Sequence, residues 1–503
     1  MTPEPIATTP AITSGRASHT ERQSSSWDIK NAPRNYFSLV AFQVGSAVFA
    51  FGSVWLITRF LGAEGYGGIV AVIAASQVAQ VLVQWTSLSV VRFGVDEFVE
   101  NASIARTFWT RFIILGVNLA IVLATAVLWF PPLADWLRLS PDKFWLIVLH
   151  FGVTALWLHV QMGLQGAKML REQGFLQMSE RLIILTGILA LIASGHLTFY
   201  WAVMCYIAGP ALMVLAGLFR LRELVFARFS LNTAVFRKLI IFSLPLLPFT
   251  LIGYFSGSYV DAVFISKFLS TSDLGVYSVA TQINGMAMQM PMLANTILLP
   301  LFITLRAESG DQRSFEYFRN VLPGLTLVWG IGCTFLAFLG YFAIPMVFGA
   351  EFQPATIPLW ILLAAATVGI PVAIGYSALS NATSKTYIAM VAAILSASAN
   401  VVANFILIPQ YGLAGCAFAT LIAFFVGVTV FAILLKRDAG MPISWSYAAF
   451  VPCIAGTILF CWQRNAPLGL AVCLGASMLV GYWFRSSLLK TVSFVKGLRG
   501  TPV

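Results

Sequence analysis

Apolar residues fill most of the chain beyond residue 35, in segments long enough to cross a lipid bilayer. A spanning helix needs about 20 mostly apolar residues. These segments are apolar all round, whereas the strands of a membrane β-barrel alternate between apolar and polar positions. The pattern predicts an all-α polytopic membrane protein with about 14 transmembrane helices, at residues 36–60, 66–91, 108–130, 143–166, 175–195, 199–219, 238–268, 274–304, 320–348, 354–380, 385–408, 412–435, 446–463 and 467–485.

The composition agrees with a bilayer as the solvent of this chain. Of its 503 residues, 59% are hydrophobic and only 10% are charged, which is too few charges to cover a soluble globule of this size. Residues 1–35 are rich in Ser, Thr and Pro and lack the apolar core of a secretory signal. We expect this segment to form a disordered cytoplasmic tail.

The distribution of basic residues predicts how the chain is oriented in the membrane. If the N-terminus is inside, all but five of the 30 Lys and Arg residues fall on the cytoplasmic side. This asymmetry is the positive-inside signature, so we expect both termini in the cytoplasm. It accounts for the formal charge of +11 without a nucleic-acid partner, and leaves outside Arg59, Arg138, Lys143, Lys267 and Arg464.

The sequence predicts neither a cofactor nor a metal site. All six cysteines lie in apolar segments without a CxxC pair, a pattern that favours small packing residues over zinc ligands or disulfides. The sequence holds no P-loop, so we do not expect direct use of ATP. A membrane polymerase or glycosyltransferase remains an alternative, although it would need a domain with paired carboxylates. We predict that the chain is not an enzyme.

Two segments of the chain repeat at a gapless offset of 208 residues. ITRFLGAEGYG at 57–67 aligns with ISKFLSTSDLG at 265–275, which matches Gly67 to Gly275 and Arg59 to Lys267. Each copy closes an odd-numbered span and opens the next one, so both copies have the same orientation across the membrane. The repeat therefore predicts two parallel six-helix halves related by an axis along the membrane normal.

A third segment, NVVANFILIPQYGLAGCAFAT at 400–420, ends an apolar helix at Pro409, turns through Gly412 and restarts in small residues. Proline ends the helical ladder and glycine permits the tight turn. Together with the two repeat segments it resembles hairpins of the polysaccharide (O-antigen) flippase family, in the superfamily that also holds the multidrug and toxin extruders. Asn400 and Asn404, which belong to this motif, are expected to cap or cross-link helices.

The resemblance implies a fold of two six-helix bundles around a central cavity, with two extra helices at the C-terminus. On this basis the expected organisation is a tail at 1–35, an N-terminal bundle at 36–219, a basic linker at 220–237, a C-terminal bundle at 238–435, two additional helices at 446–485 and a cytoplasmic tail at 486–503.

Amide side chains mark a candidate substrate path through the predicted spans. Gln77, Gln80 and Gln84 share one helical face near the middle of the second span, and Gln282 and Gln289 repeat the pattern in the eighth. These amides are candidates to bind sugar hydroxyls from a cavity wall. The alternative is that they hydrogen-bond neighbouring helices, which is a common function of buried amides in membranes.

Asp261 is the only acidic side chain deep within a predicted span. A carboxyl inside the membrane is a candidate functional site by default, so we predict that it exchanges a proton or binds a cation during transport. A structural ion pair with Arg59 or Lys267 is the alternative. Those two bases, placed at the outer mouth by the repeat, are candidate phosphate ligands. Arg111 and Arg181, near the cytoplasmic ends of the third and fifth spans, could belong to the same positively charged passage, but we expect them to reach lipid phosphates instead.

One further face, in the fourth span, carries polar side chains, with His159 on the opposite side of that helix. They are His150, Thr154, Trp157, Gln161 and Gln165.

The family resemblance supplies the expected substrate, an undecaprenyl-diphosphate-linked glycan repeat moved across the bacterial inner membrane for surface or exopolysaccharide biosynthesis. Membrane lipids, this lipid-linked oligosaccharide and other polysaccharide-assembly proteins are the expected partners. The runner-up is a cation-coupled multidrug extruder of the same superfamily. We would expect an extruder to carry more acidic residues in its N-terminal bundle, whereas the first six spans here contain only Glu180, close to the end of a span.

Overall fold

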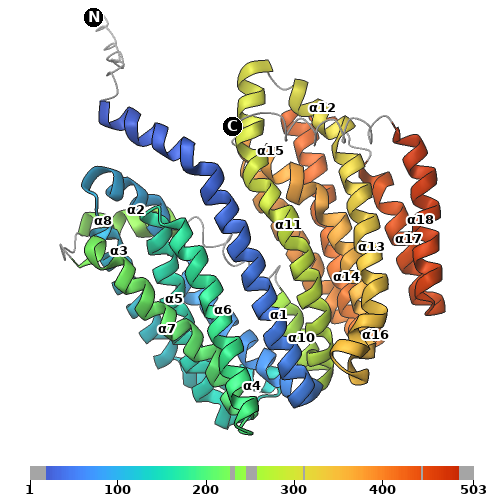
Figure 1. Cartoon of the computed structure of the whole chain (residues 1–503), viewed down its shortest axis with the longest axis horizontal. Coiled ribbons are helices and arrows are strands. Elements are labelled where there is room, and N and C mark those ends of the chain that lie inside the picture. The colour runs from blue at the N-terminus through green and yellow to red at the C-terminus, as the bar shows by residue number, and fades with distance from the viewer. Residues whose placement is uncertain are drawn as a thin grey trace, which may run out of the picture.

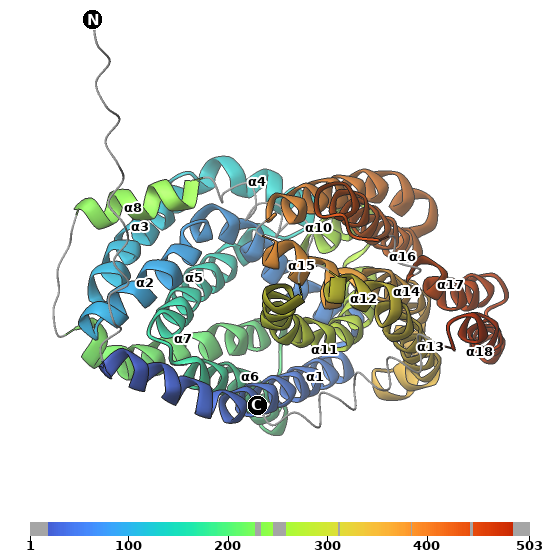
Figure 2. The ribbon, with the colours of Figure 1, turned by 90° about the horizontal axis from the view of Figure 1, so that it is seen from above.

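The computed structural model describes residues 19–226, 233–244, 258–309, 312–383, 385–442 and 446–485. Throughout these ranges the regular structure is helical, and no strand occurs in them. Two groups of helices stand side by side, with the first spans of the chain between them (Figures 1 and 2). The predicted all-α fold is confirmed.

The first group of helices follows the N-terminal part of the chain. The long helix α1 packs against α6 of this group and against α11 of the second group. The group consists of α1 (His19–Gln84), α2 (Ser87–Asn101), α3 (Ala105–Ala124), α4 (Ala126–Leu137), α5 (Phe144–Gly166), α6 (Leu170–Ala193), α7 (Phe199–Val225) and α8 (Thr233–Ser243).

The second group contains the remaining helices, with α17 and α18 at its outer edge, where they pack against α13 (Figure 2). Its members are α10 (Ser258–Phe268), α11 (Thr271–Ser309), α12 (Gln312–Asn320), α13 (Leu322–Val347), α14 (Thr356–Pro371), α15 (Ser377–Ala382), α16 (Tyr387–Ala439), α17 (Ser446–Gln463) and α18 (Ala466–Trp483).

Among the described residues, ten helical segments are long and apolar enough to cross a membrane. Two of them, Ala41–Gln84 and Tyr387–Ala439, have 44 and 53 residues and would be far longer than a bilayer of about 30 Å if they were straight. Each one folds back at a glycine with positive φ, Gly62 at 68° and Gly412 at 58°. Each therefore holds two of the predicted spans.

Helix α11 covers the predicted span at 274–304, and α8 and α10 lie at the two ends of the span at 238–268. The middle of that span, residues 245–257, lies outside the described residues.

The N-terminal tail differs from the prediction. Helix α1 begins at His19, inside the segment expected to be disordered, while residues 1–18 lie outside the described part of the chain. Residues 19–32 contain neither glycine nor proline. Pro33 lies inside the helix, between this polar segment and the apolar span, and proline disfavours a helix interior, so the continuation of the helix is not expected from the sequence.

The two repeat segments meet where α1 crosses α11. A methyl group built on Gly67 would lie 1.9 Å from the carbonyl oxygen of Thr271, and one built on Gly275 would lie 2.0 Å from the carbonyl oxygen of Ala63. Thr271 stands 208 residues after Ala63, which is the offset of the repeat. The two contacts are therefore equivalent, as a two-fold relation between parallel halves requires.

The crossing lies at the end of the molecule where the two groups of helices converge (Figure 1). At the same end, α4 packs against α10. The indole of Trp136 on α4 lies 6.2 Å from the ring of Phe264 and 5.2 Å from the ammonium of Lys267. Backbone and aromatic contacts thus hold the halves together here, whereas their ribbons diverge toward the end where α1 begins (Figure 1).

Candidate functional site

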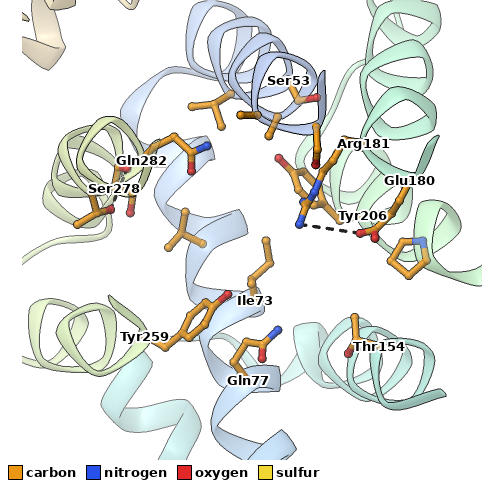
Figure 3. A pocket seen from close by; sticks show the side chains of 18 of the residues that line it. Ser53, Ile73, Gln77, Thr154, Glu180, Arg181, Tyr206, Tyr259, Ser278 and Gln282 are labelled. Atoms are coloured by element: carbon orange, nitrogen blue, oxygen red, sulfur yellow. Dashed lines mark hydrogen bonds and ion pairs between the residues drawn. The ribbon is translucent and has the colours of Figure 1, made fainter. Parts of the chain in front are cut away.

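A cavity of about 820 Å³ lies between the two groups of helices. We call it the central cavity. Its wall comes from α1, α5, α6 and α7 on one side and from α10 and α11 on the other, and Figure 3 shows polar side chains pointing into it from both. The polar side chains in the lining are Gln43, Ser46, Ser53, Tyr66, Gln77, His150, Thr154, Trp157, Gln161, Gln177, Glu180, Arg181, Tyr206, Tyr259, Tyr277, Ser278, Thr281, Gln282 and Gln289.

Arg181 supplies the positive charge of this cavity and is the one Lys or Arg among the described lining residues. It lies on α6, and its side chain is 40% exposed. Tyr206 of α7 and Tyr259 of α10 line the same cavity, so the guanidinium faces a space bounded by both halves (Figure 3). An arginine in this position presents several N–H donors to an anion.

The predicted lipid-facing position of Arg181 is therefore wrong. The same position at the membrane surface was predicted for Arg111 on α3. Arg111 does not reach that surface either, because it is completely buried. Arg111 donates to Gln84 through Nη2 at 2.7 Å. A basic residue near the end of a span can reach inward as readily as outward, and helix packing decides between the two directions.

The glutamines predicted to bind substrate have two different roles in the structure. Gln77, Gln282 and Gln289 line the central cavity. Gln80, however, is fully buried and donates to the Phe151 carbonyl oxygen at 2.8 Å and to Thr154 Oγ1 at 2.7 Å, both on α5.

Gln84 donates to Gln80 Oε1 at 3.1 Å and to the Ala155 carbonyl oxygen at 3.3 Å. The prediction of one continuous cavity face is wrong for Gln80 and Gln84. Gln84 lies seven residues from Gln77, about 10 Å along the helix, where α5 and α3 pack over α1. These two amides therefore join helices.

Four polar residues of the predicted α5 face line the central cavity, a position that the sequence alone did not indicate. His150, Thr154, Trp157 and Gln161 line the central cavity, whereas Gln165 is not among its lining residues. His150 Nδ1 lies 2.6 Å from the hydroxyl oxygen of Ser76. His159 lies on the other side of the helix, where its ring packs 4.2 Å from that of Phe108.

Asp261 lies on α10 and is buried, with 6% of its surface exposed. Its carboxylate accepts hydrogen bonds from Tyr277 at 3.0 Å, from Asn404 at 3.1 Å and from Thr420 at 3.1 Å. Asn404 also donates to Asn400 at 3.0 Å. Asn404 thus connects α16 to α10, and Asp261 is held by three neutral donors.

The alternative of an ion pair with Arg59 or Lys267 is not present among the described residues. Arg59 is exposed at the end of its span, and the ammonium of Lys267 lies over the Trp136 ring. Neither base lines the central cavity. Lys267 follows Asp261 by six positions, which on a helix places it on a different face.

Asp261 also lines a second cavity, of about 530 Å³, inside the C-terminal half. We call it the C-terminal cavity. Small and apolar side chains of α14 and α16 form most of its wall, with Asn284 and Asn400 among the few polar ones. Thr281 of α11 lines both this cavity and the central cavity, so the two cavities adjoin at this residue.

The described residues contain no group of three or more His, Cys, Asp or Glu side chains that could hold a metal ion.

Solved structures share this fold of two helical halves. A lipid II flippase MurJ in an inward closed conformation is 14% identical with a TM-score of 0.65, over 89% of this chain and 99% of that one. An inward-facing multidrug resistance MATE transporter of the MOP superfamily is 13% identical with a TM-score of 0.54, over 78% of this chain and 95% of that one.

The chain belongs to the family described as "Polysaccharide biosynthesis protein", whose model matches residues 32–306. This match confirms the family resemblance predicted from the sequence. A curated relative, "Probable low-salt glycan biosynthesis flippase Agl15" of Haloferax volcanii, is 27% identical over 196 residues. That alignment covers 39% of this chain and 41% of the relative, so it spans less than half of the relative's length.

Proposed function

We propose that this protein is a lipid-linked oligosaccharide flippase. The single observation that carries the proposal is the central cavity, whose wall offers amides and hydroxyls from both halves and one guanidinium. Sugar hydroxyls both donate and accept hydrogen bonds, so they match amide side chains. The family membership and the name of the Haloferax relative support the same class of substrate.

In this proposal Arg181 binds the diphosphate of the carrier lipid. Hydrogen bonds between a guanidinium and phosphate oxygens are charge-assisted and stronger than neutral ones. Gln77, Gln282 and Gln289 contact the glycan, while the polyprenyl tail remains in the hydrocarbon of the bilayer. We expect an undecaprenyl carrier in a bacterial inner membrane, both termini in the cytoplasm, and polysaccharide-assembly proteins as further partners.

We propose in addition that Asp261 couples transport to a proton or a cation. Three neutral donors hold its carboxylate beside the C-terminal cavity. A carboxylate within the membrane is costly unless it takes up a proton or a counter-ion. Because Thr281 lines both cavities, a change of charge at Asp261 occurs next to the proposed path of the substrate.

Transport in proteoliposomes tests the proposed function. Purified full-length protein is reconstituted with a fluorescent undecaprenyl-diphosphate disaccharide, and the label that reaches the opposite leaflet is removed by an added glycosidase. We expect transport by the wild type, at least about a tenfold loss in Arg181→Gln, and no change in the control Arg222→Gln, an exposed arginine that does not line the cavity.

A lipophilic cationic dye serves as the competing substrate in the same vesicles. If the wild-type protein moves the dye but not the lipid-linked sugar, the proposed function is wrong and the extruder alternative takes its place.

A further inference from the structure

The carboxylate of Glu180 stands beside Arg181, the one Lys or Arg among the described residues that line the central cavity. Glu180 precedes Arg181 on α6, and its Oε1 lies 4.0 Å from Nη2 of Arg181. Figure 3 shows both side chains at the cavity wall, joined by a dashed line. Glu180 is also the one carboxylate among the described residues that line this cavity. The wall therefore carries one anion and one cation in contact.

The other oxygen of this carboxylate is fixed by a second helix. Trp157 on α5 donates from Nε1 to Glu180 Oε2 at 2.7 Å, and Trp157 is itself 3% exposed. A buried, charge-assisted hydrogen bond of this length holds the carboxylate in a defined orientation. Glu180 is thus positioned by its neighbours before any ligand arrives.

The two charged groups differ in how far they reach into the cavity. The side chain of Glu180 is 10% exposed, whereas that of Arg181 is 40% exposed. The carboxylate consequently stays at the wall, and the guanidinium faces the space that a ligand would occupy. An incoming anion and the Glu180 carboxylate therefore act on the same guanidinium.

We propose that Glu180 is a specificity-determining residue that competes with the anionic group of the ligand for Arg181. This inference rests on the proposed function, because it takes Arg181 as the ligand of a lipid diphosphate. In the empty cavity Glu180 neutralises Arg181 and keeps it in place. A ligand with several negative charges overcomes this competition, whereas a neutral one gains nothing from Arg181. The fixed carboxylate also weakens binding enough to permit release on the opposite side.

Coulomb's law makes the test specific, because the interaction energy scales with the charge of the ligand. Removal of the negative charge of Glu180 should increase affinity most for a ligand with a diphosphate, less for a monophosphate and not at all for an alcohol. A role of Glu180 in folding alone would change the affinity for all three ligands to the same extent.

Binding to purified full-length protein in nanodiscs, measured by calorimetry at constant ionic strength, tests the inference with farnesyl diphosphate, farnesyl monophosphate and farnesol. We expect Glu180→Gln to bind the diphosphate about fivefold more tightly, the monophosphate about twofold more tightly and the alcohol unchanged, as for removal of one charge from a pair whose cation is partly exposed. Glu172→Gln is the matched control, since Glu172 lies on the same helix but does not line the cavity.

Each other outcome contradicts a defined part of the account. The inference is wrong if Glu180→Gln changes the affinity for all three ligands equally, leaves it unchanged or weakens diphosphate binding. The proposed function still stands in that case, provided that the wild type binds the diphosphate and Arg181→Gln does not. If the wild type binds none of the three ligands, the inference and the anion site of the proposed function are both wrong.

Discussion

In the N-terminal half, Glu180 lies beside a cation at the wall of the central cavity, whereas in the C-terminal half Asp261 lies among three neutral donors beside the C-terminal cavity. The same two halves meet through equivalent contacts at Gly67 and Gly275. The repeat thus preserves the backbone crossing but not the chemistry around the buried carboxylates. We infer that the N-terminal half recognises the anionic substrate and the C-terminal half couples its movement to an ion.

The largest expected effect is on stability, and it tests the backbone crossing that both halves form at Gly67 and Gly275. Alanine at Gly67 or at Gly275 would place a methyl group about 2 Å from a backbone oxygen of the other half, which the backbone cannot avoid without shifting. We expect each variant to lose about 3 kcal/mol of stability, measured by thermal denaturation in detergent. Gly332→Ala, at a glycine with open space around it, is the control. A large loss in only one of the two variants would contradict the two-fold equivalence of the crossing.

The next effect distinguishes ion coupling by the C-terminal half from ligand binding by the N-terminal half. Asp261→Asn keeps the shape of the side chain but removes its titratable charge. We expect gradient-driven accumulation of the lipid-linked sugar to fall about tenfold in this variant, with farnesyl diphosphate binding within about twofold of the wild type. Arg181→Gln should lose binding itself. If Asp261→Asn loses binding to the same degree as Arg181→Gln, the division of roles between the halves is wrong.

A smaller effect distinguishes the glutamines of α1. Gln80→Ala removes the hydrogen bonds that join α1 to the Thr154 hydroxyl and the Phe151 carbonyl of α5, and it deprives the buried Gln84 amide of one of its acceptors. We therefore expect a loss of about 2 kcal/mol in unfolding free energy. Gln77 lines the cavity, and its replacement by alanine should cost less than about 0.5 kcal/mol. Chemical denaturation of both variants provides the comparison, and equal losses would argue against separate roles for the two residues.

The smallest effect concerns the outer bases. Lys267 contributes one cation–π contact with Trp136, worth about 0.5 to 1 kcal/mol at an exposed site, and Arg59 is exposed. We expect transport by Lys267→Gln and Arg59→Gln to stay within about twofold of the wild type. A loss as large as that of Arg181→Gln would return these two residues to the substrate path.

Features that depend on neighbouring residues were predictable from the sequence. The turn at Gly412, the orientation of His159 away from the other polar residues of its helix and the aligned glycines of the repeat follow from helical periodicity and from the conformational freedom of glycine. The repeat predicted that Gly67 and Gly275 occupy equivalent positions in two parallel halves, but the contact between them is known only from the structure.

Features that depend on packing between distant segments were not predictable. Asn404 reaches Asp261 across 143 residues of sequence, and no periodicity relates the two positions. Arg181 faces the cavity because of how α6 packs against α1 and α7. Gln77 and Gln84 lie on one face of α1, yet α5 and α3 cover Gln84 and leave Gln77 at the cavity. A face of a helix is therefore not a uniform environment along its length.

The central claim is that an anionic, lipid-linked glycan passes through the central cavity. A single cysteine at position 77 or at position 80, in a background without the six native cysteines, tests this claim most directly. With a small hydrophilic thiol reagent, we predict that Gln77→Cys is labelled, that an undecaprenyl-diphosphate oligosaccharide protects it, and that Gln80→Cys is not labelled. Labelling of Gln77→Cys that the lipid-linked oligosaccharide leaves unchanged, while the same preparation transports it, would contradict the account.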